Sequence, residues 1–267
     1  MVNLIVAGAA GRMGGRLVCL LKDSATLVLR AAVENKGHIS IGQDAGDMAT
    51  CGHIGVTIGD DLSAVIDQGE VVIDFSTPAA SLGHLRIASQ HRRAMVIGTT
   101  GFTASELAEL RTLVKTIACV VSPNMSIGIN LIFKVIDEMA QALGEDYDIE
   151  VIEAHHRLKK DAPSGTALKL VEILARALGR DLDQVGVYTR KGRMQERKRG
   201  EIGIQSIRAG DIVGDHTVIF GGMGERVEVT HRAQSRDTFA RGALRSAEWV
   251  VRQPPGLYDM LDVLGLR

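Results

Sequence analysis

From Met1 to about Asn124, short runs of apolar and β-branched side chains alternate with longer helix-like stretches. This alternation is typical of a parallel sheet with helices on both faces, and the near-continuous apolar runs fit strands buried on both faces. The expected strands are Asn3–Ala7, Leu27–Val33, Val71–Phe75, Ala94–Ile97 and Ala118–Val121. The expected helices are Gly11–Lys22, Asp61–Gln68, Pro78–Gln90 and Thr103–Thr116.

The pattern changes after Asn124, where longer helices and shorter strand-like runs follow one another. The expected elements are helices at Asn130–Leu143 and Ser164–Gly179 and strands at Asp148–Ala154, Glu201–Arg208, Asp215–Phe220 and Arg226–Ala233. The last three runs are separated by short segments with Gly and Asp, which favour antiparallel pairing. We therefore expect a second, α+β domain with an open mixed sheet. A final helix, Asp237–Arg252, is expected to pack back on the first domain.

The first expected strand runs into a turn with glycines three residues apart, followed by a helix. Glycine lets such a turn tighten and lets backbone N–H groups approach a pyrophosphate at the positive end of the helix. The spacing is a variant of the dinucleotide-binding pattern and is only moderately specific, so a simple tight turn is the alternative. The residues expected to line the cofactor here are Gly8, Ala9, Ala10, Gly11, Arg12 and Met13.

Glu34 follows the second expected strand, 20 residues after Gly14, where an acidic side chain accepts hydrogen bonds from a ribose. A solvated surface glutamate is the alternative. Asn35 is neutral, and Lys36 meets a 2′-phosphate only if it turns inward, so the choice between NADH and NADPH stays open. Together with the glycine turn, Glu34 predicts a Rossmann-like, doubly wound parallel sheet that binds NADH, NADPH or both.

Two later strand ends are followed by small and hydroxyl-bearing residues at the carboxyl edge of the sheet, where ligands bind in open α/β folds. We expect them to line the nicotinamide and its ribose, with ordinary turns as the alternative. Ser76-Thr77-Pro78 is a similar but weaker candidate. The residues of the two loops are Gly98, Thr99 and Thr100, and Ser122, Pro123, Asn124 and Met125.

The most informative segment, residues 153–168, reads E-A-H-H-R-L-K-K-D-A-P-S-G-T-A-L. Ser164 is a good amino-cap residue, and the N–H groups of Gly165 and Thr166 at the positive end of the helix predict a carboxylate site. If the substrate is a small dianion, its second carboxylate would lie near His156 or Lys160. His155 and Lys159 have the chemistry needed to deliver a proton once a hydride has arrived.

The alternative for this segment is a pair of structural histidines beside a solvated run of lysines. His155, His156 and Asp161 also offer metal-ligand atoms, but adjacent histidines rarely converge on one ion and no second cluster completes a tetrahedron. We therefore expect no metal.

Charge and cysteine content limit the partners and the compartment. Lys and Arg total 31 against 32 Asp and Glu, so no nucleic-acid or membrane partner is expected. The three cysteines, Cys19, Cys51 and Cys119, show no paired spacing. The apolar run at the amino terminus meets glycines within seven residues, so we read no export or membrane signal. A cytoplasmic protein is expected.

The segment 153–168 resembles the signature of the 4-hydroxy-tetrahydrodipicolinate reductase (dihydrodipicolinate reductase) family. The strings V-A-G-A-A-G-R-M-G, I-G-T-T-G-F, S-I-R-A-G-D-I-V-G-D-H-T-V and T-H-R-A-Q-S-R-D-T-F-A-R-G-A-L-R are similar to the same family in order and spacing. The resemblance covers nearly the whole chain.

The resemblance implies reduction of 4-hydroxy-tetrahydrodipicolinate to tetrahydrodipicolinate in lysine biosynthesis, in a homotetramer joined through the carboxyl-terminal sheet. It makes His155 a proton donor or acceptor and Lys159 a proton donor, and it places the substrate's carboxylates on His156, Gly165 and Thr166. Two features depart from it. Asn35 stands where many relatives have an Arg that pairs with the 2′-phosphate of NADPH, although Arg12 or Lys36 would compensate. The loop Arg190–Arg199 is unusually basic, and only a solvated or phosphate-screening role is offered for it.

The expected domains are a dinucleotide-binding domain of residues 1–126 plus 236–267 and a substrate-binding and oligomerisation domain of residues 127–235, closing over the substrate. One rival is another two-domain dehydrogenase, such as an aldehyde or sugar oxidoreductase or one of another small carboxylate. The lack of a cysteine beside the cleft motifs argues against an acylating aldehyde dehydrogenase, and the D-A-P-S-G-T helix start argues for a carboxylated substrate. The other is a dinucleotide-binding redox sensor without turnover, which would normally add a basic DNA-reading module.

Overall fold

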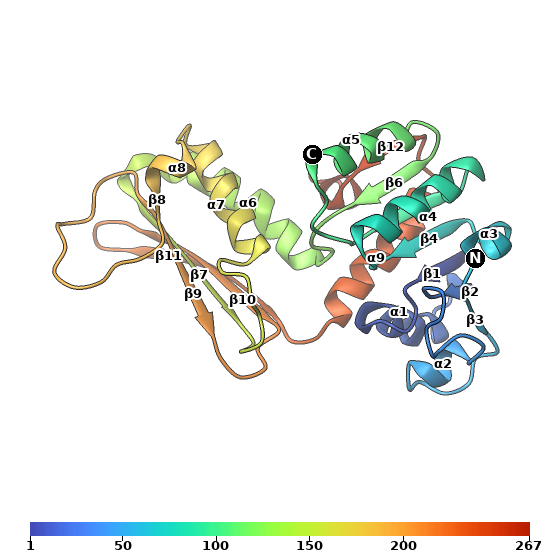
Figure 1. The fold of residues 1–267 in the computed structure, drawn as a ribbon. Helices are drawn as coiled ribbons and strands as arrows, with labels where there is room; N and C mark the ends of the chain where they lie inside the picture. Colours follow the sequence, from blue (N-terminus) through green and yellow to red (C-terminus); the bar gives the residue numbers. More distant parts are fainter. The chain divides into compact units, whose positions relative to one another are not determined.

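The computed structural model describes all residues from 1 to 267, and the chain divides into two compact units (Figure 1). Unit 1 comprises Met1–Ile127 and Arg236–Arg267, and unit 2 comprises Gly128–Ser235. Unit 2 is therefore an insertion into the chain of unit 1. Each unit has its own sheet and its own apolar core.

Unit 1 is built on a seven-stranded sheet in which every pair of neighbouring strands is parallel. Its strands are β1 (Val2–Ala7), β2 (Leu27–Val33), β3 (Ile58–Gly59), β4 (Val71–Asp74), β5 (Ala94–Ile97), β6 (Ala118–Val121) and β12 (Gly256–Tyr258). The strand order is β12-β6-β5-β4-β1-β2-β3. The chain leaves β1 in one direction and returns to add β4 on its other side, so the strand order reverses between these two strands. Ligands bind at such a reversal, outside the carboxyl ends of the strands.

Helices cover both faces of this sheet, as Figure 1 shows for α1 and α9 on one side and α4 and α5 on the other. Successive side chains of a strand point to opposite faces, so Leu4 and Val6 join one core cluster while Ile5 and Ala7 join the other. The first cluster includes side chains of α1 (Arg12–Lys22), α9 (Asp237–Val250) and α10 (Met260–Leu264). The second includes side chains of α3 (Leu62–Val65), the 3-10 turn Ile66–Gln68, α4 (Pro78–Gln90) and α5 (Ala104–Leu113).

The carboxyl-terminal segment completes unit 1 in two ways. Helix α9 packs so closely that a Cβ on Gly242 would lie 1.7 Å from the carbonyl oxygen of Met125, so only glycine fits there. Strand β12 then pairs with β6 at the edge of the sheet. The sequence predicts the helix, but three residues after Pro254-Pro255 are too short a run to predict the strand.

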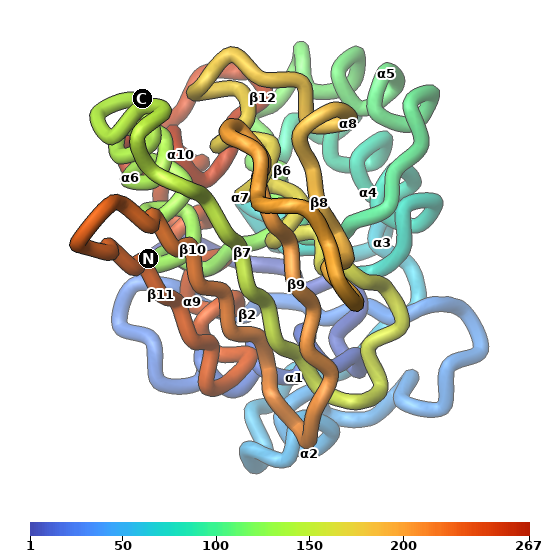
Figure 2. Tube along the Cα trace, turned by 90° about the vertical axis from the view of Figure 1, so that its left-hand side faces the viewer, coloured from blue at the N-terminus to red at the C-terminus, as the bar shows by residue number.

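Unit 2 packs two long helices against one face of a five-stranded sheet (Figure 1). The helices are α6 (Ile127–Leu143) and α7 (Gly165–Ala177), with a 3-10 turn at Gly144–Asp146 and a short α8 (Leu182–Val185). The strands are β7 (Asp148–His155), β8 (Gly186–Val187), β9 (Ile202–Arg208), β10 (Gly214–Gly221) and β11 (Arg226–Ala233). In Figure 2 these strands lie side by side with no helix of unit 2 in front of them, so the second face of the sheet is not covered by this unit.

The sheet of unit 2 is mixed, in the order β11-β10-β7-β9-β8. Strands β10 and β11 pair antiparallel, as their short connection predicts. The expected antiparallel pairing of β9 with β10 is wrong, because β7 lies between them, parallel to β9 and antiparallel to β10. With β7 in the centre, β9 and β10 both bury apolar side chains against the helices. The short loop between β9 and β10 gives no sign in the sequence that β7 lies between them.

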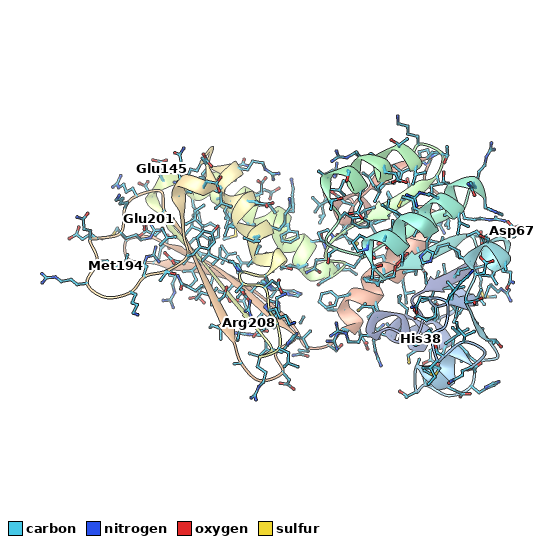
Figure 3. The ribbon with its side chains drawn as sticks, viewed as in Figure 1. His38, Asp67, Glu145, Met194, Glu201 and Arg208 are labelled. Carbon is cyan, nitrogen blue, oxygen red and sulfur yellow. The ribbon has the colours of Figure 1, made fainter.

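The basic loop of residues 190–199 is partly tied to β7. Arg190 lies 2.8 Å from Glu150, and Arg197 contacts both Glu150 and Asp148. Figure 3 shows Met194, an exposed residue of this loop, and Arg208 at the end of β9. Two of the arginines therefore pair with acidic side chains of the sheet.

A short excursion between β2 and β3 contains α2 (Ala45–Met48), which the sequence analysis does not predict. Here Asp44, Asp47 and His53 hold ligand-type atoms within 4.8 Å of one another. The carboxylate of Asp44, however, accepts hydrogen bonds from the backbone N–H groups of Gly46, Asp47, Ile54 and Val56. These bonds account for the cluster as the cap of a short helix and the anchor of a loop.

Candidate active site

The cofactor residues expected from the sequence all follow the carboxyl ends of parallel strands in unit 1. Residues 8–13 follow β1, Glu34 follows β2, residues 98–100 follow β5 and residues 122–125 follow β6. Because these strands lie in one parallel sheet, their carboxyl ends meet at one edge. The structure therefore brings the four segments to the same edge, on either side of the loop that follows β4.

The glycines after β1 form a tight strand-to-helix turn. Gly8 has φ of +72°, which favours glycine, and its carbonyl accepts a hydrogen bond from Gly11 N–H at 3.0 Å. A Cβ on Gly14 would lie 2.1 Å from that same carbonyl oxygen, so any larger residue would force the helix away from the strand. The two positions explain why the turn needs glycine at each end.

Glu34 lies against the glycine turn. Its carboxylate accepts hydrogen bonds from Ala10 N–H at 3.2 Å and from Asn35 N–H at 2.9 Å. The side chain is half-buried, whereas Arg12, Asn35 and Lys36 are exposed. The structure thus places the carboxylate of Glu34, a hydrogen-bond acceptor, against the glycine turn, with the cationic side chains of Arg12 and Lys36 exposed nearby in the sequence.

The loops after β5 and β6 are held by their own polar contacts. Thr99 is buried and Thr100 is exposed. After β6, Ser122 donates its hydroxyl to the carbonyl of Asn124 at 2.8 Å, and the Asn124 side chain accepts Ser126 N–H at 2.9 Å. Met125 is buried in the core of unit 1, so its side chain is not available to a ligand.

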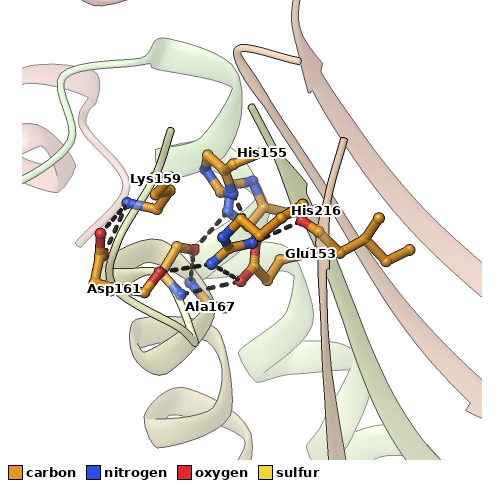
Figure 4. Close-up of polar contacts among 9 residues, drawn as sticks. Glu153, His155, Lys159, Asp161, Ala167 and His216 are labelled. Carbon is orange, nitrogen blue, oxygen red and sulfur yellow. Dashed lines mark hydrogen bonds and ion pairs between the residues drawn. The ribbon is translucent and has the colours of Figure 1, made fainter. Parts of the chain in front are cut away.

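In unit 2, a fully buried carboxylate lies at the end of the central strand. Glu153 accepts two hydrogen bonds from the guanidinium of Arg208, both at 2.8 Å, and one from Ser164 N–H at 3.2 Å. His155 Nδ1 lies 2.5 Å from the same carboxylate (Figure 4). Strands β7 and β9 and the start of α7 therefore meet at one charged group.

Burial opposes the charge of Glu153, but hydrogen bonds from Arg208, Ser206 and His155 outweigh it and lower the pKa of Glu153 to about 2. Burial lowers the pKa of His155, and the hydrogen bond to Glu153 offsets only part of this effect. His155 is consequently neutral near pH 7. Its Nδ1 carries the proton that Glu153 accepts, which leaves Nε2 with a lone pair.

A second buried histidine lies against the first. The rings of His155 and His216 are 5.2 Å apart in an edge-to-face arrangement, and His216 Nε2 lies 3.2 Å from the Ser164 hydroxyl. Burial lowers the pKa of His216 to about 3, so this ring stays neutral at physiological pH. Gly214 makes room for the pair, since a Cβ there would lie 3.1 Å from His155 Nε2.

Helix α7 begins beside these groups, with Ser164 as its cap. The Ser164 hydroxyl accepts Ala167 N–H at 3.2 Å, and the first two helical residues are Gly165 and Thr166. A Cβ on Gly165 would meet no atom within 4 Å, so the space before this helix end is open. The amino end of a helix favours an anion because N–H groups and the helix dipole point toward it.

The remaining predicted residues lie on the loop between β7 and α7. His156 is half-buried and follows His155 directly. Lys159 pairs with Asp161, with Nζ 2.8 and 2.9 Å from the two carboxylate oxygens. Lys160 is exposed. The loop thus places the pair of Lys159 and Asp161 beside the buried cluster (Figure 4).

Comparisons with known proteins decide the family. Residues 2–125 match the model of the dihydrodipicolinate reductase amino terminus, and residues 128–264 match that of its carboxyl terminus. The chain belongs to the dihydrodipicolinate reductase family. It is 54% identical over its full length to the full-length 4-hydroxy-tetrahydrodipicolinate reductases of Syntrophus aciditrophicus (strain SB) and Geotalea uraniireducens (strain Rf4).

A solved member of the family also matches the fold. The dipicolinate-bound dihydrodipicolinate reductase from Paenisporosarcina sp. TG-14 gives a TM-score of 0.74 at 25% identity, over 98% of each chain. The predicted fold class, a Rossmann-like sheet with a second α+β domain, is confirmed. No helix of this family member combines the length and hydropathy needed to cross a membrane.

Sequence reasoning assigned no role to three residues of the candidate site: Glu153, Arg208 and His216. All three lie within strings that resemble the family, so a signal was present. Arg208 and His216 are 55 and 63 positions beyond Glu153, however, and only the pairing of β7 with β9 and β10 brings them together. Local spacing alone does not reveal these contacts.

The ionised Glu153 predicts a pH-dependent stability. Its folded pKa of about 2 lies below the ordinary value of 4.5, so its contribution is present above about pH 4.5 and is lost as the pH falls toward 2. The unfolding free energy of Glu153→Gln should lie below that of the unaltered protein at pH 7. This gap should shrink by about 2 kcal/mol between pH 7 and pH 3. Urea unfolding from pH 7 to 3 measures it, with exposed Glu172→Gln as control; a constant gap would contradict the prediction.

Proposed function

We propose that the chain reduces 4-hydroxy-tetrahydrodipicolinate to tetrahydrodipicolinate in lysine and diaminopimelate biosynthesis, using NADH or NADPH. The proposal rests on family membership and on one observation, the hydrogen bond between His155 and buried Glu153 beside the open end of α7. In it, unit 1 binds the dinucleotide and unit 2 binds the substrate. The reaction consumes one hydride and one proton and releases water from the 4-hydroxyl carbon.

The open end of α7 supports binding of a small dicarboxylate. Gly165 and Thr166 would hold one carboxylate at the helix end, and His156 would hold the second. The solved relative from Paenisporosarcina is described as bound to dipicolinate, a ring with two carboxylates. Lys160 is exposed and available to add positive charge near the second carboxylate.

His155 and Lys159 would accept and donate the proton that the reduction requires. The lone pair on His155 Nε2 accepts a proton, and Glu153 stabilises the resulting imidazolium through Nδ1–H. Lys159 supplies a proton from its ammonium group, which lies 2.8 Å from the carboxylate of Asp161. A proton from this pair then adds to the ring atom that becomes basic when the adjacent carbon receives hydride.

The reduced nicotinamide supplies the hydride when it is bound. Residues 8–13 would hold the pyrophosphate, Glu34 the adenosine ribose, and residues 98–100 and 122–125 the nicotinamide half. Asn35 offers no charge to a 2′-phosphate, whereas exposed Arg12 and Lys36 do. We therefore expect the protein to use both NADH and NADPH.

The first test is oxidation of each cofactor, followed at the nicotinamide absorbance with freshly generated 4-hydroxy-tetrahydrodipicolinate. We expect oxidation that depends on this substrate with NADH and with NADPH. Oxidation with neither, in a folded protein that still binds cofactor, would favour a different dehydrogenase or a non-catalytic sensor.

His155→Ala should lower kcat by roughly 10²- to 10⁴-fold, because a positioned proton-transfer group typically contributes that much. The dissociation constant of NADH should stay unchanged, since His155 lies in unit 2. Stopped-flow turnover and calorimetric cofactor binding measure the two quantities. His91→Ala, an exchange of a histidine that pairs with Asp67 in unit 1, is the control. An unchanged kcat in His155→Ala would remove this residue from the mechanism.

The uncovered face of the unit 2 sheet supports a homotetramer. Its outward side chains include Ile152, Ile219 and Ile207, the last 48% exposed, in the three central strands. Burying such a face against a second copy removes apolar area from water. In the family, members are commonly joined through this sheet.

Ile207→Glu should shift the assembly toward smaller species, because it puts a charge into the proposed interface. Analytical ultracentrifugation is expected to give four times the chain mass for the unaltered protein and a lower mass for the variant. Ile39→Glu changes an 84% exposed isoleucine of unit 1 and should remain tetrameric. A monomeric unaltered protein would end the tetramer proposal.

A further inference from the structure

A series of hydrogen-bonded polar side chains, most of them buried, runs along the carboxyl edge of the unit 1 sheet. Packing of the apolar core does not account for these hydrogen bonds. The series starts at Asp74, the last residue of β4, whose side chain has no exposed area. One carboxylate oxygen accepts Ser76 N–H at 2.7 Å and the Ser76 hydroxyl at 2.6 Å. The other lies 2.7 Å from His84 Nδ1 on α4. Asp74 thus holds both the loop after β4 and the helix that follows it.

The series continues to the loop after β5. The Ser76 and Ser81 hydroxyls are 3.4 Å apart, and the hydroxyls of Ser81 and Thr99 share a hydrogen bond of 2.7 Å. Ser81 and Thr99 are both buried. A buried hydroxyl needs a partner, so each of these two satisfies the other.

Packing reinforces the same connection. A Cβ on Gly98 would lie 2.0 Å from the ring of Phe75, so the ring lies directly against the backbone of the β5 loop. On the other side, Ser76 Cβ lies within 3.7 Å of the Cβ position of Gly8 in the glycine turn. The loop after β4 is therefore in contact with both of its neighbours.

We propose that Asp74, Ser76 and Ser81 are positioning residues, which fix Thr99 and the backbone of residues 98–100 in the geometry that receives the nicotinamide half of the cofactor. The proposal rests on the proposed function. None of the three needs to touch the cofactor, because they act through the Ser81–Thr99 hydrogen bond and the Phe75–Gly98 contact. The adenosine half, held by residues 8–13 and Glu34, does not depend on Thr99.

This division leads to a test with two ligands. ADP contains the adenosine and the pyrophosphate but lacks both the nicotinamide and its ribose, so it reports only on the adenosine half of the site. Ser81→Ala should weaken NADH binding by about five- to tenfold, as expected when a buried hydroxyl loses its partner. Its binding of ADP should equal that of the unaltered protein. Titration calorimetry without substrate measures both constants.

A matched control lies on the same helix. Ser89, in the last turn of α4, shares a 2.7 Å hydrogen bond with the hydroxyl of Thr116, away from the cofactor edge. Ser89→Ala should change neither constant. Thr99→Val removes the hydrogen bond from its other partner and should repeat the effect of Ser81→Ala, while Thr99→Ser keeps the hydroxyl and should restore NADH binding.

Equal weakening of both ligands in Ser81→Ala and Thr99→Val, or no weakening of NADH in either, would overturn the proposal. The first result would mean that the polar series only stabilises unit 1. Failure of the unaltered protein to bind NADH would contradict the proposed function itself, which separates the two failures.

Discussion

A charged group that is buried away from water needs an opposite charge and hydrogen bonds. In unit 2 the carboxylate of Glu153 is such a group, and its partners come from several elements. Taking a carboxylate out of water is costly unless opposite charge and hydrogen bonds replace the lost hydration. Arg208 supplies the charge, and Ser164 N–H and His155 supply further hydrogen bonds. Because these partners come from β9, the start of α7 and β7 itself, satisfying one carboxylate also fixes the distance between a helix end and a histidine.

Unit 1 solves a similar problem at the edge of its sheet. There, Asp74 is buried at the end of β4 and is satisfied by Ser76 and His84. In both units a buried acid at a strand end orders the loops that follow it. Apolar packing holds the strands together, while the orientation of the loop atoms depends on these few charged or hydroxyl groups.

Much of the fold was predictable, for reasons that particular elements make clear. Strands β2, β5 and β6 have the bounds expected from the sequence, because burial on both faces demands nearly continuous apolar residues, which only the exposed Arg30 of β2 interrupts. Helix α4 was likewise predicted at both ends, with Thr77 capping it ahead of Pro78. Strands β3 and β12 have two and three residues, too few to show a period, and depend on a neighbouring strand that the local sequence does not reveal.

The site was predictable only in its local part. Histidines 155 and 156 and the helix start at Gly165 lie close together in sequence, so their chemistry is visible as a pattern. The contact of Glu153 with Arg208 spans 55 positions, and that of Ser164 with His216 spans 52. Such contacts depend on which strands become neighbours, and the order of strands in unit 2 was the part of the topology that short-loop reasoning misjudged.

The route of the chain through the two units has a consequence for synthesis. A ribosome makes unit 2, residues 128–235, in one continuous piece, and domains generally fold as units while the chain emerges. Unit 1 still lacks α9, β12 and α10 at that moment, so of the helices α1, α9 and α10 in the first core cluster only α1 has been made. The first half of the protein to be made is therefore the last to be finished, because the core on one face of its sheet stays incomplete until the carboxyl-terminal segment is made.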